Sequence, residues 1–132
     1  MKKREDATPI PTESAEQQCL FRWATMQGAA WPELELLYHV PNGGRRSASE
    51  AGRFKAEGVR AGVPDICLPV ARYPWHGLYI ELKRRKGGRL SDEQTKWLAR
   101  LEEQGYRAVR CDGWEAAAIE ITRYLKGGAR EP

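Results

Sequence analysis

The sequence contains little cysteine, little histidine and no long run of hydrophobic residues. Its 132 residues include three cysteines and two histidines, and no Cys-x-x-Cys pair occurs. We therefore expect neither a disulfide-stapled scaffold nor a zinc knuckle, and we expect a reduced, cytoplasmic protein. No apolar stretch approaches the roughly 20 residues of a membrane span, and Glu5, Asp6 and Pro9 stand where a signal peptide needs its apolar core. Membrane insertion and secretion are therefore not expected.

Positive charge, by contrast, is concentrated in two stretches. The chain has 22 Lys and Arg against 18 Asp and Glu, a net charge of +4. Residues 43–63 carry +3 and residues 81–89 carry +4, so the remainder is slightly acidic. Such stretches suit an anionic partner, although ordinary solvated surface explains them equally well when they are considered alone. The length is that of one domain with a single core.

Hydrophobic periodicity and capping signals predict alternating helices and strands. The predicted helices cover residues 13–27, 47–57, 91–104 and 114–125. The predicted strands cover residues 33–40, 65–71, 78–84 and 106–111. Residues 1–12 are expected to form a flexible leader, residues 13–126 a single domain and residues 127–132 a frayed tail. This order predicts an α/β fold in which a mixed sheet is flanked by helices.

Three ionisable residues on two predicted strands form a candidate metal site. Glu81 and Lys83 are two residues apart on a strand, so both leave the face opposite the apolar one and are expected to look into one cleft. Asp65 follows Pro64 at the start of the preceding strand, and hairpin pairing would bring its carboxylate beside that of Glu81. Two carboxylates with a neighbouring lysine suit a hard divalent cation such as Mg²⁺.

Each of these parts also has a purely structural explanation. A Glu-x-Lys pair on a strand is usually a solvated face with a weak ion pair, and Pro-Asp is usually a turn. Gln94 completes a Ser91-x-x-Gln94 capping box, and Glu13 favours the positive end of a helix. The functional interpretation therefore depends on the joint order of these parts between two basic stretches.

In that order the motifs resemble the VRR-NUC branch of the PD-(D/E)XK nucleases, in particular its small stand-alone phage and bacterial members. The blocks that carry the resemblance are HVPNGG at 39–44, EGVRAGVPD at 57–65, GLYIELK at 77–83, SxxQ at 91–94 and GY at 105–106. The resemblance covers about residues 13–125, nearly all of the chain that is expected to be ordered. The resemblance implies a restriction-endonuclease-like core in which a central mixed sheet is flanked by helices.

The resemblance also implies a set of catalytic residues. Asp65, Glu81 and the backbone carbonyl of Leu82 would bind Mg²⁺, for which Mn²⁺ is expected to substitute, and Lys83 would be the catalytic lysine. Gln94 would line the cleft, provided that its side chain does not fold back onto the Ser91 amide.

A glutamate of the first helix completes this metal-ligand and catalytic set. Counting back from Gln17, which matches the glutamine of the family, gives Glu13. Glu16 lies one turn further on and would serve instead if the helix register differs. We select Glu13 and keep Glu16 as the alternative.

The implied activity is that of a Mg²⁺-dependent DNA endonuclease that leaves a 5′-phosphate and a 3′-hydroxyl. The residues expected to contact DNA are Asn42, Arg45, Arg46, Arg53, Lys55, Arg60, Arg84, Arg85 and Lys86. Backbone contacts of this kind set affinity and position, not sequence. No base-reading module is evident, so we expect selection of branched DNA such as four-way junctions or flaps by a homodimer in bacterial or phage-infected cytoplasm. The alternatives are a non-catalytic nucleic-acid-binding module on the same scaffold and a structural protein.

Overall fold

The computed structural model describes residues 9–41 and 47–129. In chain order its elements are α1 (Glu13–Met26), the 3-10 helix η1 (Pro32–Leu36), β1 (Tyr38–His39), α2 (Ala48–Ala56), β2 (Ile66–Leu68), β3 (Leu78–Lys83), α3 (Asp92–Glu103), β4 (Arg107–Asp112) and α4 (Trp114–Leu125). Within the described residues, no helix is long and apolar enough to span a bilayer.

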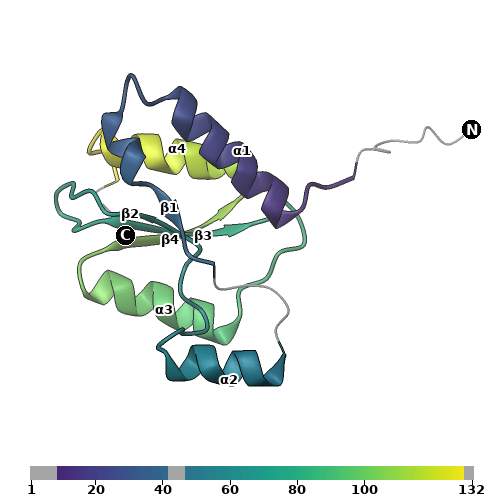
Figure 1. The fold of residues 1–132 in the computed structure, drawn as a ribbon. Coiled ribbons are helices and arrows are strands. Elements are labelled where there is room, and N and C mark those ends of the chain that lie inside the picture. The colour runs from purple at the N-terminus through teal and green to yellow at the C-terminus, as the bar shows by residue number, and fades with distance from the viewer. Residues whose placement is uncertain (1–8, 42–46, 130–132) are drawn as a thin grey trace, which may run out of the picture.

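The four strands form one mixed sheet in the order β1-β2-β3-β4. The first two pairings are antiparallel and the β3–β4 pairing is parallel. The crossover between β3 and β4 contains α3, which lies on the opposite side of the sheet from α1 and α4, and α2 lies beyond α3 (Figure 1). The main core fills the space between the sheet and the α1–α4 pair, where Leu20, Ile80 and Ile121 are almost fully buried. The predicted mixed α/β fold is confirmed.

Local capping chemistry explains the positions of the helix starts. The Thr12 hydroxyl accepts a hydrogen bond from the Ala15 amide at the start of α1, and Ser47 does the same for Glu50 in α2. Ser91 and Gln94 form the predicted capping box of α3. These short-range signals can be read directly from the sequence, and the predicted helices agree with the structure to within a few residues.

The prediction of a strand over residues 33–40 is wrong in its first half. Residues Pro32–Leu36 form η1, and the strand is limited to Tyr38 and His39. Proline suits the first turn of a helix because its missing amide hydrogen has no acceptor there. Leu34 and Leu37 are the buried residues of this segment, and their spacing of three is helical rather than alternating. The strand predicted at 65–71 is likewise shorter, Ile66–Leu68, since Pro69 cannot donate to a ladder.

Burial extends further than the sequence predicts. Glu81 and Lys83, which were expected to look into a cleft, are only 1% and 8% exposed. The tail expected to fray from residue 127 is packed as far as Ala129, which is buried and whose carbonyl accepts a hydrogen bond from the Trp75 indole. At the other end, the carbonyl of Ile10 accepts a hydrogen bond from Arg84, so the described part of the leader contacts the domain.

Candidate active site

The antiparallel β2–β3 pair brings Asp65 and Glu81 together. Ile66 pairs with Ile80, so Asp65, which directly precedes β2, falls opposite Glu81. The Leu82 amide donates a hydrogen bond to Asp65 Oδ2 at 3.1 Å. The aspartate is therefore fixed against the strand that carries the second carboxylate, as hairpin pairing predicted.

The glycine-rich loop before Asp65 is shaped by contact with α3. Gly62 has φ +91°, and a Cβ at this position would lie 2.6 Å from the backbone carbon of Glu93. No other residue type fits such an approach without a shift of the backbone. Pro64 is almost completely buried, so the loop packs firmly between the start of α3 and β2. The Gly-Val-Pro-Asp motif thus sets the position of the aspartate relative to α3.

Lys83 extends its ammonium group between two carboxylates. Its Nζ lies 3.8 Å from Glu81 Oε2 and 3.7 Å from Glu13 Oε1 at the start of α1. The aliphatic stem of Lys83 packs on Gly88, where an added Cβ would lie only 2.9 Å from the lysine Cβ. The Gly88 carbonyl accepts a hydrogen bond from Arg110, which holds this glycine in place. Lys83 is therefore a buried, positioned cation.

Gln94 performs its capping role and reaches the site at the same time. Its Oε1 accepts a hydrogen bond from the Ser91 amide at 2.8 Å, while its Nε2 donates to Glu81 Oε2 at 3.3 Å. The expectation that folding back onto Ser91 would remove this side chain from the cleft is wrong, because an amide offers an acceptor and donors at opposite ends. The capping box thereby joins the start of α3 to Glu81.

Glu81 is a carboxyl group whose environment disfavours its charge. Burial, together with the neighbouring Asp65 carboxylate, raises the pKa of Glu81 to about 9, and the charge of Lys83 offsets this only partly. Its Oε1 is buried and has no hydrogen-bond partner among residues 9–41 and 47–129. An unpartnered buried carboxylate oxygen beside a second carboxylate is what a divalent cation would satisfy. The residues present therefore fit Mg²⁺.

The donor set is small and depends on the backbone. Within residues 9–41 and 47–129, no three His, Cys, Asp or Glu side chains converge as metal ligands. A site built on Asp65 and Glu81 would therefore need the Leu82 carbonyl and solvent for its remaining ligands. Mg²⁺ is well suited to this arrangement because it usually keeps several water molecules.

A hollow of about 270 Å³ opens beside these residues. It is lined by Glu13, Ser14, Gln17, His39, Pro41, Asp65 and Leu82. His39 Nδ1 lies 3.0 Å from the Asp65 carbonyl oxygen, to which it donates, and the Val40 amide donates to the same oxygen at 2.6 Å. His39 and Ser14 are not among the site residues predicted from the sequence. The only available signal for His39 was its place in the HVPNGG block.

The two helix glutamates point in different directions. Glu13 is half exposed and faces Lys83, whereas Glu16 is 1% exposed and binds the Arg85 guanidinium through both oxygens, at 2.9 and 3.0 Å. The Trp114 amide also donates to Glu16 Oε1. These hydrogen bonds, chiefly those from Arg85, lower the pKa of Glu16 against the opposing effect of burial. The structure therefore brings Glu13, and not Glu16, to the candidate site.

We expect Glu16→Gln to lower the free energy of unfolding by about 1–3 kcal/mol at pH 7, since one amide cannot replace both acceptor oxygens. Because the pKa of Glu16 is lowered from 4.5 on folding, its contribution is present above that pH and lost as the pH falls below it. Denaturant titrations at pH 7 and pH 3.5 measure both effects. Glu115→Gln, which removes only an exposed contact of Arg85, is the matched control and should leave stability nearly unchanged. Equal losses in both variants would contradict this explanation.

The residues expected to bind DNA fall into three groups. Asn42, Arg45 and Arg46 lie outside the described residues. Arg53, Lys55, Arg60 and Lys86 are exposed. Arg84 and Arg85 are engaged with the protein: Arg84 donates to the Ile10 carbonyl, and Arg85 pairs with Glu16 and with Glu115. Exposed cations on α2 and on the loop after β3 are thus available to an anionic ligand, whereas Arg85 mainly holds α1 and α4 together.

Comparison with known proteins gives one consistent family. The model of the VRR-NUC domain matches residues 10–115. A solved structure described as a VRR_NUC domain protein is 30% identical to this chain, covers 92% of it and 93% of its own length, and superposes with a TM-score of 0.78. No curated protein matches the chain. The match covers the loop that carries Asp65, the strand that carries Glu81 and Lys83, and the helix that carries Gln94, so the chain belongs to the VRR-NUC family of nuclease-type domains.

Proposed function

We propose that this protein is a Mg²⁺-dependent DNA endonuclease that cleaves branched DNA. The observation that carries the proposal is a group of two adjacent carboxylates and a buried lysine. Among the described residues, one oxygen of Glu81 is buried without a partner, and the Lys83 ammonium lies 3.8 Å from the other oxygen of Glu81. Structural ion pairs do not need an unsatisfied buried carboxylate, which costs folding free energy. A cation that binds there would remove that cost.

Asp65, Glu81 and the Leu82 carbonyl would hold the cation. When bound, Mg²⁺ supplies charge neutralisation at the phosphate and activates water for attack on phosphorus. The chain itself fixes the ligands, since the Leu82 amide holds Asp65 and the Gln94 amide holds Glu81. This preorganisation limits the reorganisation needed during the reaction.

Lys83 would act on the scissile phosphate. Its ammonium is placed by the Gly88 contact and by two carboxylates, so its positive charge is held in position before the substrate binds. A fixed positive charge stabilises the negative charge that builds on the phosphate oxygens, and it also orients the attacking water. Exposed cations such as Lys55 and Lys86 would bind the flanking phosphates without reading the sequence.

Cleavage assays with labelled DNA of four shapes test the proposal. Wild-type protein should cut a four-way junction or a flap in Mg²⁺ and not in EDTA, and should cut linear duplex or single strands more slowly. Mn²⁺ should replace Mg²⁺. Equal cutting of all four shapes would refute selection by shape. Salt-sensitive binding without any cutting would instead identify a non-catalytic binding module.

The homodimer is part of the same proposal, since two sites are needed to cut a four-way junction symmetrically. Light scattering of the protein alone and of its junction complex measures the number of chains. Two chains per junction support the dimer, and one chain per junction excludes it.

A further inference from the structure

Three tyrosines gather on the face of the sheet that carries the candidate active site. Tyr38 pairs with Cys67 across β1 and β2, and Cys67 pairs with Tyr79 across β2 and β3. Directly paired residues project from the same face, so both rings lie on the side of Cys67. The Tyr106 ring meets Tyr79 edge-on, with centroids 5.5 Å apart. Tyr38 on β1, Tyr79 on β3 and Tyr106 directly before β4 form a tyrosine row.

The tyrosine row is adjacent to the two carboxylates. Asp65 and Glu81 lie two residues along their strands from Cys67 and Tyr79, and therefore on the same face. Two residues of strand span about 7 Å. Successive phosphates of one DNA strand are about 3.4 Å apart along a stacked helix. A strand whose phosphate lies at the carboxylates therefore places a base over the tyrosines within one or two nucleotides.

The row is accessible and is not part of the main core. Tyr38, on the edge strand β1, is 48% exposed, and Tyr79 and Tyr106 are partly exposed. The core on the other face is filled by residues such as Leu78 and Ile80, so it does not require the tyrosines. Hydrogen bonding to the Cys67 thiol raises the pKa of Tyr38, and burial raises that of Tyr79 to about 12. Both rings are therefore neutral phenols that do not repel a phosphate chain.

We propose that Tyr38 and Tyr79 form a stacking platform for an unpaired base next to the phosphate to be cut. The proposal rests on the proposed nuclease function and specifies its substrate as DNA with one or two unpaired nucleotides beside the cleavage site. Aromatic stacking accepts any base, because every base has a π-face. A base inside a perfect duplex is already stacked on its neighbours and is not available to the platform. Selection of branched DNA then follows from stacking without any base-reading contact.

Binding measured in EDTA tests the platform without chemistry. The probe is a flap DNA with 2-aminopurine at the first unpaired nucleotide, and a fully paired duplex with the same fluorescent base is the reference. Tyr38→Ala should weaken flap binding by about 5- to 100-fold, reduce the quenching of 2-aminopurine and leave duplex binding unchanged. Tyr38→Phe keeps the ring and should bind as the wild type does.

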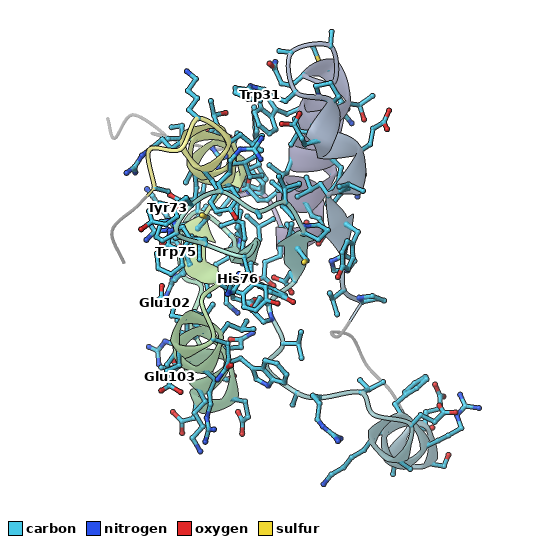
Figure 2. The ribbon with its side chains drawn as sticks, turned by 90° about the vertical axis from the view of Figure 1, so that its left-hand side faces the viewer. Trp31, Tyr73, Trp75, His76, Glu102 and Glu103 are labelled. Carbon is cyan, nitrogen blue, oxygen red and sulfur yellow. The ribbon has the colours of Figure 1, made fainter. Side chains whose placement is uncertain are left out.

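A second exposed tyrosine provides the matched control. Tyr73 is 83% exposed and lies in the turn before β3, beside Trp75 and His76 (Figure 2), whereas Asp65 and Glu81 lie toward the other end of that strand. Tyr73→Ala should leave the affinity of the protein for flap DNA and for duplex DNA unchanged. Thermal unfolding of each variant separates loss of the ring from loss of the fold.

The outcomes separate the platform from the nuclease. If Tyr38→Ala binds flap and duplex as the wild type does, or weakens both equally, the platform is refuted even where the protein cuts DNA. If Tyr38 is needed for flap binding but the wild type never cuts in Mg²⁺, the platform stands and the nuclease proposal fails.

Discussion

Replacing Lys83 with methionine is expected to slow DNA cleavage by about 100- to 10,000-fold, the range that a positioned proton-transfer or charge-stabilising group supplies. Methionine keeps most of the aliphatic stem that packs on Gly88 but removes the ammonium between Glu13 and Glu81. Single-turnover cleavage at saturating protein measures the chemical step alone. DNA affinity in EDTA should change little, because one phosphate contact among many is lost.

The control for this variant is Lys126→Met. Lys126 is exposed directly after α4, the helix on the opposite side of the sheet from α3 (Figure 1), and its replacement makes the same change in net charge. Its cleavage rate should match that of the wild type. If Lys83→Met cut as fast as Lys126→Met, Lys83 would be a structural cation only.

Glu81→Gln is expected to abolish Mg²⁺-dependent cleavage and to change how stability depends on pH. Without a cation, folding raises the pKa of Glu81 from 4.5 to about 9, so the folded protein retains a proton that the unfolded chain releases. Its contribution to stability is therefore fully present below pH 4.5 and is lost as the pH rises toward 9. The variant lacks this group, so its free energy of unfolding should decline less between pH 4.5 and pH 9 than that of the wild type. After allowance for relaxation of the buried group, we expect the two declines to differ by about 1–3 kcal/mol.

Denaturant titrations between pH 5 and pH 9 in EDTA measure this difference. Glu103→Gln, at the exposed end of α3 (Figure 2), is the matched control and should follow the wild type. Added Mg²⁺ should restore the stability of the wild type at pH 8, where it replaces the proton, and should not change Glu81→Gln. Parallel pH profiles for Glu81→Gln and the wild type would contradict the burial of an uncompensated carboxyl group.

The parts of the fold that were predictable depend on short-range signals. Thr12, Ser47 and the Ser91–Gln94 box mark helix starts by hydrogen bonds within four residues, and α4 agrees with its prediction at both ends. The strand prediction for residues 33–40 depends on an apolar-rich run bounded by turn residues, but Leu34 and Leu37 pack at helical spacing beside Pro32. A short apolar run does not by itself distinguish the two patterns.

The sequence predicts which residues form the candidate site, but it does not predict how deeply their side chains are buried. Alternation on one strand and the Pro-Asp start of another were sufficient to place Asp65 near Glu81. The burial of Glu81 and Lys83 could not be read from alternation, because it arises from α3 in the crossover and from the loop at Gly88.

The roles of the charged partners were equally hidden from the sequence. Arg85 was grouped with DNA-contacting residues because it lies in a basic stretch, but its guanidinium binds Glu16, 69 residues earlier in the chain. The same contact turns Glu16 away from Lys83 and leaves Glu13 to face it. His39 reaches the hollow through pairing of β1 with β2, a contact between residues 26 apart. Long-range pairing of this kind is set by tertiary packing.

Metal-dependent cleavage by this protein requires that Asp65 and Glu81 bind a divalent cation. Calorimetric titration of Mg²⁺ into the wild type and Asp65→Asn at pH 7.5, each in two buffers of different ionisation enthalpy, tests it directly. We predict saturable binding by the wild type with release of protons, since the raised pKa of Glu81 keeps that carboxyl largely protonated until the cation binds. Binding by Asp65→Asn should be at least about 10-fold weaker. Equal affinity in the two proteins, or binding by the wild type without proton release, would contradict the account.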